Sequence, residues 1–194
     1  FPKKYYNILE KNLDLSGFKV DNGKTFHYDG SYDETLSTRT TLKTELNVLG
    51  NFKPTVPEKY RKSEYVYLAN NDPEQNTALI KEFDKVKFSM CDTIDFWIST
   101  KRDAVIKMIK SVDAVVINDE EAKLLTKEFN LIKCAKKMMQ WGAKYVIIKK
   151  YTFVRKKKKK TNEHFINKLQ ESTFAQSFDE INRGAVLIKS HSKS

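Results

Sequence analysis

Short apolar runs alternate with helical patterns from Tyr65 onward, and this alternation constrains the fold more than any other feature of the sequence. Four runs have the length and the β-branched and aromatic content of strands, namely residues 65–69, 86–91, 114–117 and 145–149. Because these runs are too apolar to have a face in water, we expect parallel strands buried on both sides. The sequence therefore predicts an α/β fold with a parallel sheet that is covered on both faces.

Helical segments connect the predicted strands. Asp72, Pro73 and Gln75 form a helix start, with an N-cap residue, a proline at the first helical position and a glutamine at the third. Apolar residues at helical spacing predict two further amphipathic helices, the first through Ala104, Val105, Met108, Ile109 and Val112 and the second through Leu131, Ile132, Ala135, Met138 and Met139. The second ends at Gly142, a residue type that often follows the last helical residue.

The regions on either side of this core are different. Residues 24–32 and 38–46 are rich in threonine and aromatic residues with partial alternation, and Asp29-Gly30 marks a bend, so we expect an antiparallel pair that projects from the α/β body. After Lys150 the alternation stops. We therefore expect residues 1–150 to form the domain and residues 151–194 to be a basic appendage, disordered or divergent.

The excess of positive charge lies mainly in that appendage. Residues 151–194 contribute +6 of the net charge of +11, and the run Arg155–Lys160 has no aromatic residues among its lysines. This pattern favours a solvated linker over a nucleic-acid site.

No segment has the apolar length of a membrane span or a secretory signal, and Cys91 and Cys134 have no metal-site spacing. We expect a cytoplasmic protein with reduced thiols, no metal held directly by the protein, and no membrane partner.

A polar cluster ends the third predicted strand. Asn118 is followed by Asp119, Glu120 and Glu121, where a helix begins. One explanation is structural: Asn118 caps the helix, and the carboxylates favour the positive end of its dipole. The other is functional, because ligands of α/β sheets bind beyond the carboxyl ends of the strands. An amide and a carboxylate three residues apart can orient the water around nucleotide-bound Mg²⁺ there. Both explanations can hold together.

The sequence around this cluster resembles a known family. The segment "VDAVVINDEEAKLLT", followed by "AKKMMQWGAKYVIIKK", resembles the PfkB (ribokinase-like) carbohydrate and nucleoside kinases, in which a strand ends in Asn-x-x-Glu. The resemblance covers roughly residues 1–150 and includes "GKTFHYDGSY" and "TRTTLKTELNVL", which look like strands of a lid over the sugar, at about residues 24–48. It implies a partial three-layer ribokinase-like fold, ATP as co-substrate, Mg²⁺ as cofactor, and Asn118 with Glu121 as the residues for Mg²⁺ and phosphate.

The same resemblance places four residues on the substrate side of the site. In "CDTIDFWISTKR", Asp92 matches an Asp-x-Asn pattern that many family members carry near the active site, and Asp95 stands where Asn is more usual. Phe26 and Tyr28 lie in the lid-like strands. The implied substrate is a sugar or a nucleoside. The structural alternative is that Asp92 caps a helix and that Trp97 belongs to the core.

Two motifs of the family do not occur in this sequence. One is the di-glycine substrate motif of the N-terminal region, and the other is Gly-Ala-Gly-Asp, whose Asp is the general base and whose backbone amides form the anion hole. We therefore expect an incomplete kinase with impaired turnover and assign no catalytic residue. Two alternatives remain open: a non-catalytic binding or dimerisation module, since lid strands pair between subunits in some family members, and a nucleic-acid-binding protein that uses the basic tail.

Overall fold

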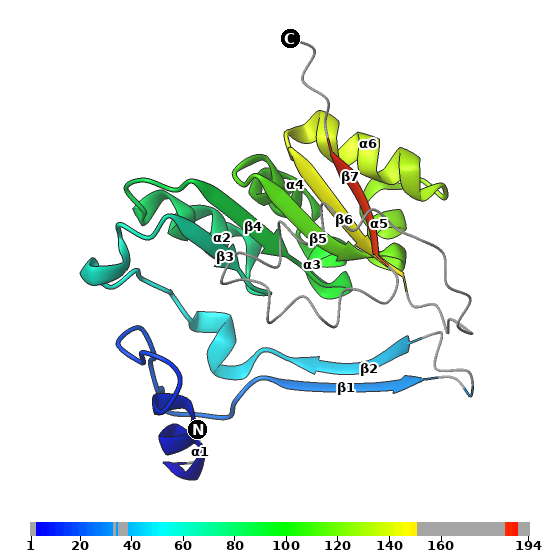
Figure 1. Ribbon diagram of the computed structural model, residues 1–194. Coiled ribbons are helices and arrows are strands. Elements are labelled where there is room, and N and C mark those ends of the chain that lie inside the picture. Colours follow the sequence, from blue (N-terminus) through cyan, green and yellow to red (C-terminus); the bar gives the residue numbers. More distant parts are fainter. Residues whose placement is uncertain (1–2, 33, 35–38, 151–184, 190–194) are drawn as a thin grey trace, which may run out of the picture. The chain divides into compact units, whose positions relative to one another are not determined.

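The computed structural model describes residues 3–32, 34, 39–150 and 185–189 (Figure 1). The chain divides into two compact units, Phe1–Ser89 and Met90–Ser194. We describe each unit by itself. In the described part of the chain, no helix has the length and hydrophobicity that crossing a membrane requires.

The described residues of the first unit form two α-helices, three short 3₁₀ helices and the strands that precede the unit boundary. In chain order these are α1 (Lys3–Glu10), β1 (His27–Tyr32), β2 (Arg39–Glu45), η1 (Asn47–Asn51), η2 (Glu58–Tyr60), β3 (Tyr65–Leu68), α2 (Pro73–Leu79) and η3 (Ile80–Glu82). The start of α2 is the predicted one, because the Asp72 side chain accepts a hydrogen bond from the Glu74 amide and Pro73 is the first helical residue.

Strands β1 and β2 form the predicted antiparallel pair. His27 is opposite Glu45 and Tyr32 is opposite Arg39. The register shifts between Asp29 and Gly30, so the Asp-Gly pair marks an irregularity within β1 and not the connection between the strands. This pair is a two-stranded sheet of its own.

A polar contact fixes the loop after α1 to η2. The Asp14 carboxylate forms an ion pair with the Lys59 ammonium group and accepts a hydrogen bond from the Ser16 amide. The hydrogen bond from Lys59 is the main reason why the pKa of Asp14 lies well below its usual range, and Tyr60 lowers it further. Both charged partners are about half exposed. The contact therefore holds the local geometry and adds little to the free energy of unfolding.

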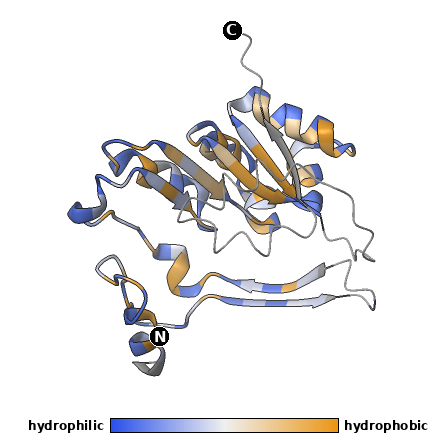
Figure 2. Cartoon of the chain, viewed as in Figure 1, coloured by the Kyte–Doolittle hydropathy of each residue, from blue (hydrophilic) through white to orange (hydrophobic). Residues whose placement is uncertain are grey.

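The second unit is built on parallel strands. The boundary between the units falls within β4 (Phe88–Asp92), which pairs in parallel with β5 (Ala114–Asn118), and β5 pairs in parallel with β6 (Tyr145–Lys149). Ala114, Val115, Val116 and Ile117 are all buried, so both faces of β5 are covered. Hydrophobic residues follow these strands in Figure 2. The predicted α/β class is confirmed, and the strands lie within two residues of their predicted ranges.

In the part of this unit that the structure describes, four helices accompany the strands: α3 (Asp95–Thr100), α4 (Arg102–Lys110), α5 (Asp119–Thr126) and α6 (Leu131–Trp141). Helix α5 contacts α3, α6 and strands β5 and β6. The core is formed by fully buried side chains on these elements, including Val105, Met108, Ile109, Leu125 and Met138. Helices α4 and α6 match the predicted amphipathic segments, and Gly142 follows the last residue of α6 with a positive φ of 129°.

One strand of the second unit was not predicted. Strand β7 (Ala185–Lys189) pairs antiparallel with β6, with Ala185 opposite Lys149 and Lys189 opposite Tyr145. It belongs to the segment that the sequence analysis treats as an appendage. The rest of that predicted appendage, including the lysine run, lies outside the described residues.

Candidate functional site

Asn118 and Glu121 meet at the carboxyl end of β5. The Glu121 amide donates a hydrogen bond of 2.8 Å to Asn118 Oδ1, and the Asn118 amide donates one of 3.0 Å to Glu121 Oε2. This reciprocal pair is a capping box at the N-terminus of α5. The structural explanation of the cluster is therefore confirmed. Glu121 is only 6% exposed, although it carries a carboxylate.

The capping box leaves one polar group of this pair without a partner. The amide nitrogen Nδ2 of Asn118 donates no hydrogen bond to any of the described residues, since Oδ1 makes the only side-chain contact. Nδ2 is a donor with two hydrogens. The structure thus separates the two groups of one side chain: Oδ1 holds the helix, and Nδ2 can bind an acceptor beyond the sheet edge.

The other end of α5 is held by two cationic side chains. Arg102 Nε donates a hydrogen bond of 2.9 Å to the Leu125 carbonyl, and Lys137 Nζ donates one of 2.7 Å to the Thr126 carbonyl. Cations at a helix C-terminus satisfy its last carbonyl groups and interact favourably with the dipole. Helix α5 is therefore fixed at both ends, and its first turn is held at the edge of the sheet.

Strand β4 brings more polar residues to the same edge. Asp92 is the last residue of β4 and is opposite Val116, two residues before Asn118. Asp92 is not the N-cap residue of α3, since that position is occupied by Ile94. Asp95 lies in the first turn of α3, where its Oδ1 accepts a hydrogen bond of 3.0 Å from the Phe96 amide. Trp97 is buried, as the structural alternative expected.

Thr93 is a residue that the sequence analysis did not select. It directly follows Asp92 and is only 5% exposed. Its hydroxyl group has no hydrogen-bond partner among the described residues. A buried polar group without a partner costs free energy. A threonine beside Asp92 gives no sequence signal of its own, so only the structure identifies this buried hydroxyl group at the sheet edge.

Phe26 and Tyr28 belong to the first unit, so their position relative to this edge is not described. Phe26 is 37% exposed. The Tyr28 hydroxyl group lies 3.3 Å from Thr41 Oγ1 across the β1–β2 pair. The assignment of these two residues to the substrate side stays a prediction.

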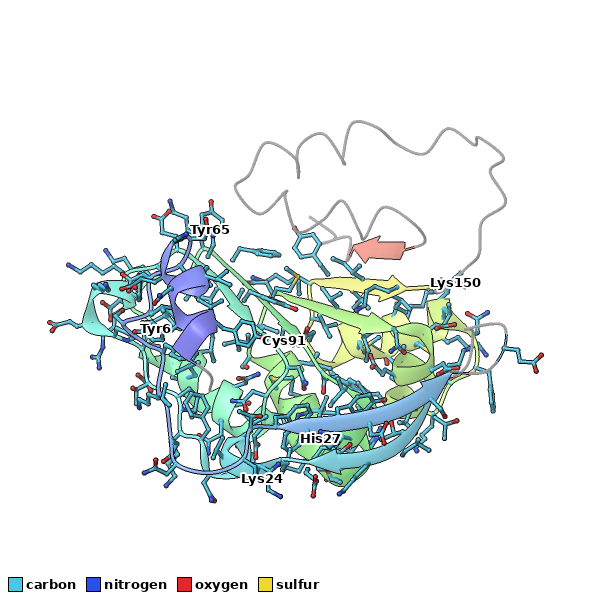
Figure 3. The ribbon with its side chains drawn as sticks, turned by 90° about the horizontal axis from the view of Figure 1, so that it is seen from below. Tyr6, Lys24, His27, Tyr65, Cys91 and Lys150 are labelled. Atoms are coloured by element: carbon cyan, nitrogen blue, oxygen red, sulfur yellow. The ribbon has the colours of Figure 1, made fainter. Side chains whose placement is uncertain are left out.

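Cys91 does not provide a reactive thiol at this edge. Cys91 is fully buried in β4 (Figure 3), and desolvation, helped by the charge of Asp92, raises the pKa of its thiol far above the usual range. Such a thiol is unreactive. Within the described ranges, no group of three or more His, Cys, Asp and Glu side chains could hold a metal ion.

No protein-family model matches the chain. One curated protein resembles it in sequence: the cytidine kinase of Thermococcus kodakarensis is 27% identical over 160 residues. The match covers 76% of this chain and 54% of that kinase. The chain thus spans about half the length of the curated relative that it matches.

Two solved structures resemble this chain in fold. One is the nucleoside kinase of Methanocaldococcus jannaschii, an archaeal member of the ribokinase family, with a TM-score of 0.57 at 13% identity. The match covers 89% of this chain and 64% of the kinase chain. The other is the ribokinase of Thermotoga maritima, with a TM-score of 0.55 at 18% identity. The match covers 82% of this chain and 56% of the ribokinase chain. The resemblance to the PfkB (ribokinase-like) kinases is confirmed, and so is the partial ribokinase-like α/β fold.

Proposed function

We propose, on the premise that this chain has the ribokinase-like fold, that it carries the phosphate side of an ATP-dependent kinase site. The reaction is transfer of the γ-phosphoryl group of ATP to a hydroxyl group of a nucleoside or a sugar. The observation that carries the proposal is the Asn118–Glu121 pair at the carboxyl end of a central parallel strand, where α/β sheets bind their ligands.

Asn118 binds a phosphate oxygen in this proposal. Its Nδ2 group donates no hydrogen bond to a described residue, and the hydrogen bond from the Glu121 amide to Oδ1 holds the orientation of the side-chain amide group. A donor whose orientation is fixed before the ligand arrives needs no reorganisation on binding. The capping box is thus the reason why Asn118 can act as a positioned phosphate ligand.

The residues present fit Mg²⁺ held through water. Glu121 keeps an almost buried carboxylate at this edge, and one of its oxygens is already engaged by the Asn118 amide. Mg²⁺ usually keeps several waters and needs one or two carboxylates in addition to the substrate phosphates. Glu121 would orient those waters. When bound, Mg²⁺ supplies neutralisation of the charge on the transferred phosphoryl group.

A nucleoside is the acceptor to test first. The relatives that support the proposal are a cytidine kinase and a nucleoside kinase, and a ribokinase supports the sugar alternative. In this proposal Asp92 and Asp95 contact the substrate, and Phe26 and Tyr28 are proposed separately as substrate-binding residues of the first unit. Asp92 is half-buried at the edge that also carries Asn118, which suits a carboxylate that accepts hydrogen bonds from substrate hydroxyl groups.

The 194-residue chain binds MgATP but turns over slowly in this proposal. The sequence given has no Gly-Ala-Gly-Asp motif, and loss of a general base alone reduces rates by roughly 10² to 10⁴. Calorimetric titration with MgATP tests binding, and a phosphorylation assay with cytidine and ribose tests turnover. Rapid phosphorylation of either acceptor would contradict the slow-turnover part, and absence of MgATP binding would contradict the proposal as a whole.

The chain also forms a homodimer through β1 and β2 in this proposal. The observation behind it is that these strands form a two-stranded sheet, and such a sheet is only marginally stable in water unless further strands or a helix cover it. Light scattering should give the mass of two chains. A monomer mass at concentrations of about 100 μM would contradict the dimer, because stable interfaces of standard size persist far below that concentration.

A further inference from the structure

Lys149 lies at the carboxyl end of β6, next to the Asn118–Glu121 pair. In the register of the two parallel strands, Asn118 is directly opposite Lys149. Neighbouring strands are about 4.8 Å apart, and opposite residues of adjacent strands project from the same face of the sheet. The Lys149 side chain therefore starts from the same edge and the same face as the Asn118 amide.

Lys149 has no structural partner in the described part of the chain. Its side chain is half-buried, but its ammonium group forms neither an ion pair nor a hydrogen bond with a described residue. Two of the acidic residues nearby have other partners: Asp119 lies 3.6 Å from the Lys123 ammonium group, and Glu121 is in the capping box. An ammonium group without a partner among the described residues can pair with a ligand anion at this edge.

The charge of the site supports an anion-binding role for this lysine. The first turn of α5 carries three carboxylates, on Asp119, Glu120 and Glu121. These carboxylates favour a cation and repel a phosphate group that approaches the helix N-terminus. A phosphate bound by Asn118 therefore needs positive charge close by, and Lys149 is the lysine opposite Asn118 in the sheet.

We propose that Lys149 is a phosphate-binding residue, whose ammonium group pairs with the β- or γ-phosphate of the nucleotide held by Asn118. The proposal rests on the proposed function. Lysine suits this role, because its ammonium group is a compact charge that forms strong charge-assisted hydrogen bonds with phosphate oxygens. No covalent step is assigned to Lys149.

The test compares Lys149→Met with Lys150→Met in the full chain. Lys150 directly follows the last residue of β6 (Figure 3) and is exposed, so its variant loses the same charge one residue away. Methionine keeps a side chain of similar length, which preserves the packing of the stem. Calorimetry would measure the Kd of MgATP, MgADP and adenosine. We expect Lys149→Met to raise the Kd of MgATP and MgADP roughly tenfold and to leave adenosine unchanged.

The outcomes separate this inference from the proposed function. Unchanged MgATP affinity in Lys149→Met, with binding by the wild-type chain, would overturn the role of Lys149 and leave the proposed function standing. If Lys150→Met weakened MgATP binding as much as Lys149→Met does, the role of Lys149 would also be overturned. The loss of affinity would then come from the lower net charge of the region and not from one positioned ammonium group. Failure of the wild-type chain to bind MgATP would overturn both. Lys149→Arg provides a second test in case the methionine variant misfolds. It keeps the positive charge, so it should retain MgATP affinity within about threefold.

Discussion

Asn118→Asp should abolish measurable MgATP binding and leave the fold intact. The change replaces Nδ2, the donor assigned to a phosphate oxygen, by a carboxylate oxygen. Loss of a hydrogen bond to a charged group costs about 1.5–3 kcal/mol, and placing like charges next to each other adds several kcal/mol. We expect the Kd of MgATP, measured by calorimetry, to rise at least roughly 100-fold.

The capping box makes aspartate the right replacement at this position. Asn118→Ala would remove both groups of the side chain, and loss of an N-cap costs about 1 kcal/mol, so lost binding could then reflect a frayed helix. Aspartate keeps an acceptor for the Glu121 amide, and Asp and Asn are about equally good N-cap residues. Its added charge lies close to Glu121, so we expect the free energy of unfolding to change by less than about 1 kcal/mol.

Asn130→Asp is the matched control. Asn130 is the N-cap residue of α6, and its Oδ1 accepts hydrogen bonds from the Ile132 and Lys133 amides. The chemical change and the capping role are the same as at Asn118, but Asn130 is exposed and is not part of the proposed site. MgATP binding should be unchanged in this variant. Wild-type affinity in Asn118→Asp would show that Asn118 is a helix cap only.

Much of the sheet follows from the sequence because its strands are buried on both faces. Burial requires continuous apolar residues, and these runs are visible without a structure. Strand β4 begins at Phe88, two residues later than predicted, because the Lys87 amide donates a hydrogen bond to the Glu64 carbonyl just before the strand starts. Apolar Val86 thus lies before the strand, and the apolar pattern does not show this boundary.

Two elements of the second unit give weak sequence signals. Helix α3 has six residues, and its N-cap residue is Ile94, a β-branched residue without a capping side chain, so the usual start pattern is missing. Strand β7 pairs with β6 across a separation of 36 residues between Lys149 and Ala185. Pairing at such a separation depends on tertiary structure, and the apolar run of β7 alone does not indicate a partner.

At the candidate site too, some features can be predicted from the sequence and others require the structure. The Asn-x-x-Glu spacing predicts the cap and indicates the ligand edge, because both depend on local sequence. The roles of the individual atoms do not follow from the spacing, since only the hydrogen bonds show that Oδ1 of Asn118 is engaged and Nδ2 is not. Lys149 was read as the end of a strand, and its position opposite Asn118 depends on the register between β5 and β6.

Leu125→Ala should destabilise the second unit strongly. Leu125 is fully buried in α5, the helix that carries Glu121 and contacts α3, α6 and two strands. Truncation of a buried leucine to alanine removes apolar contacts and leaves a cavity, which typically costs about 2–5 kcal/mol. That is a large part of the roughly 5–15 kcal/mol that stabilises a domain. Urea unfolding, followed by circular dichroism, would measure the shift of the midpoint.

Ile132→Ala is the control for this effect. Ile132 lies in α6 and is 55% exposed, and its truncation removes the same number of carbon atoms. We expect a change within about 0.5 kcal/mol, as at other exposed positions. A small effect of Leu125→Ala would contradict the packing of α5 on the sheet. It would also remove the physical basis for a fixed Glu121, because the first turn of α5 keeps its place only when the helix is packed.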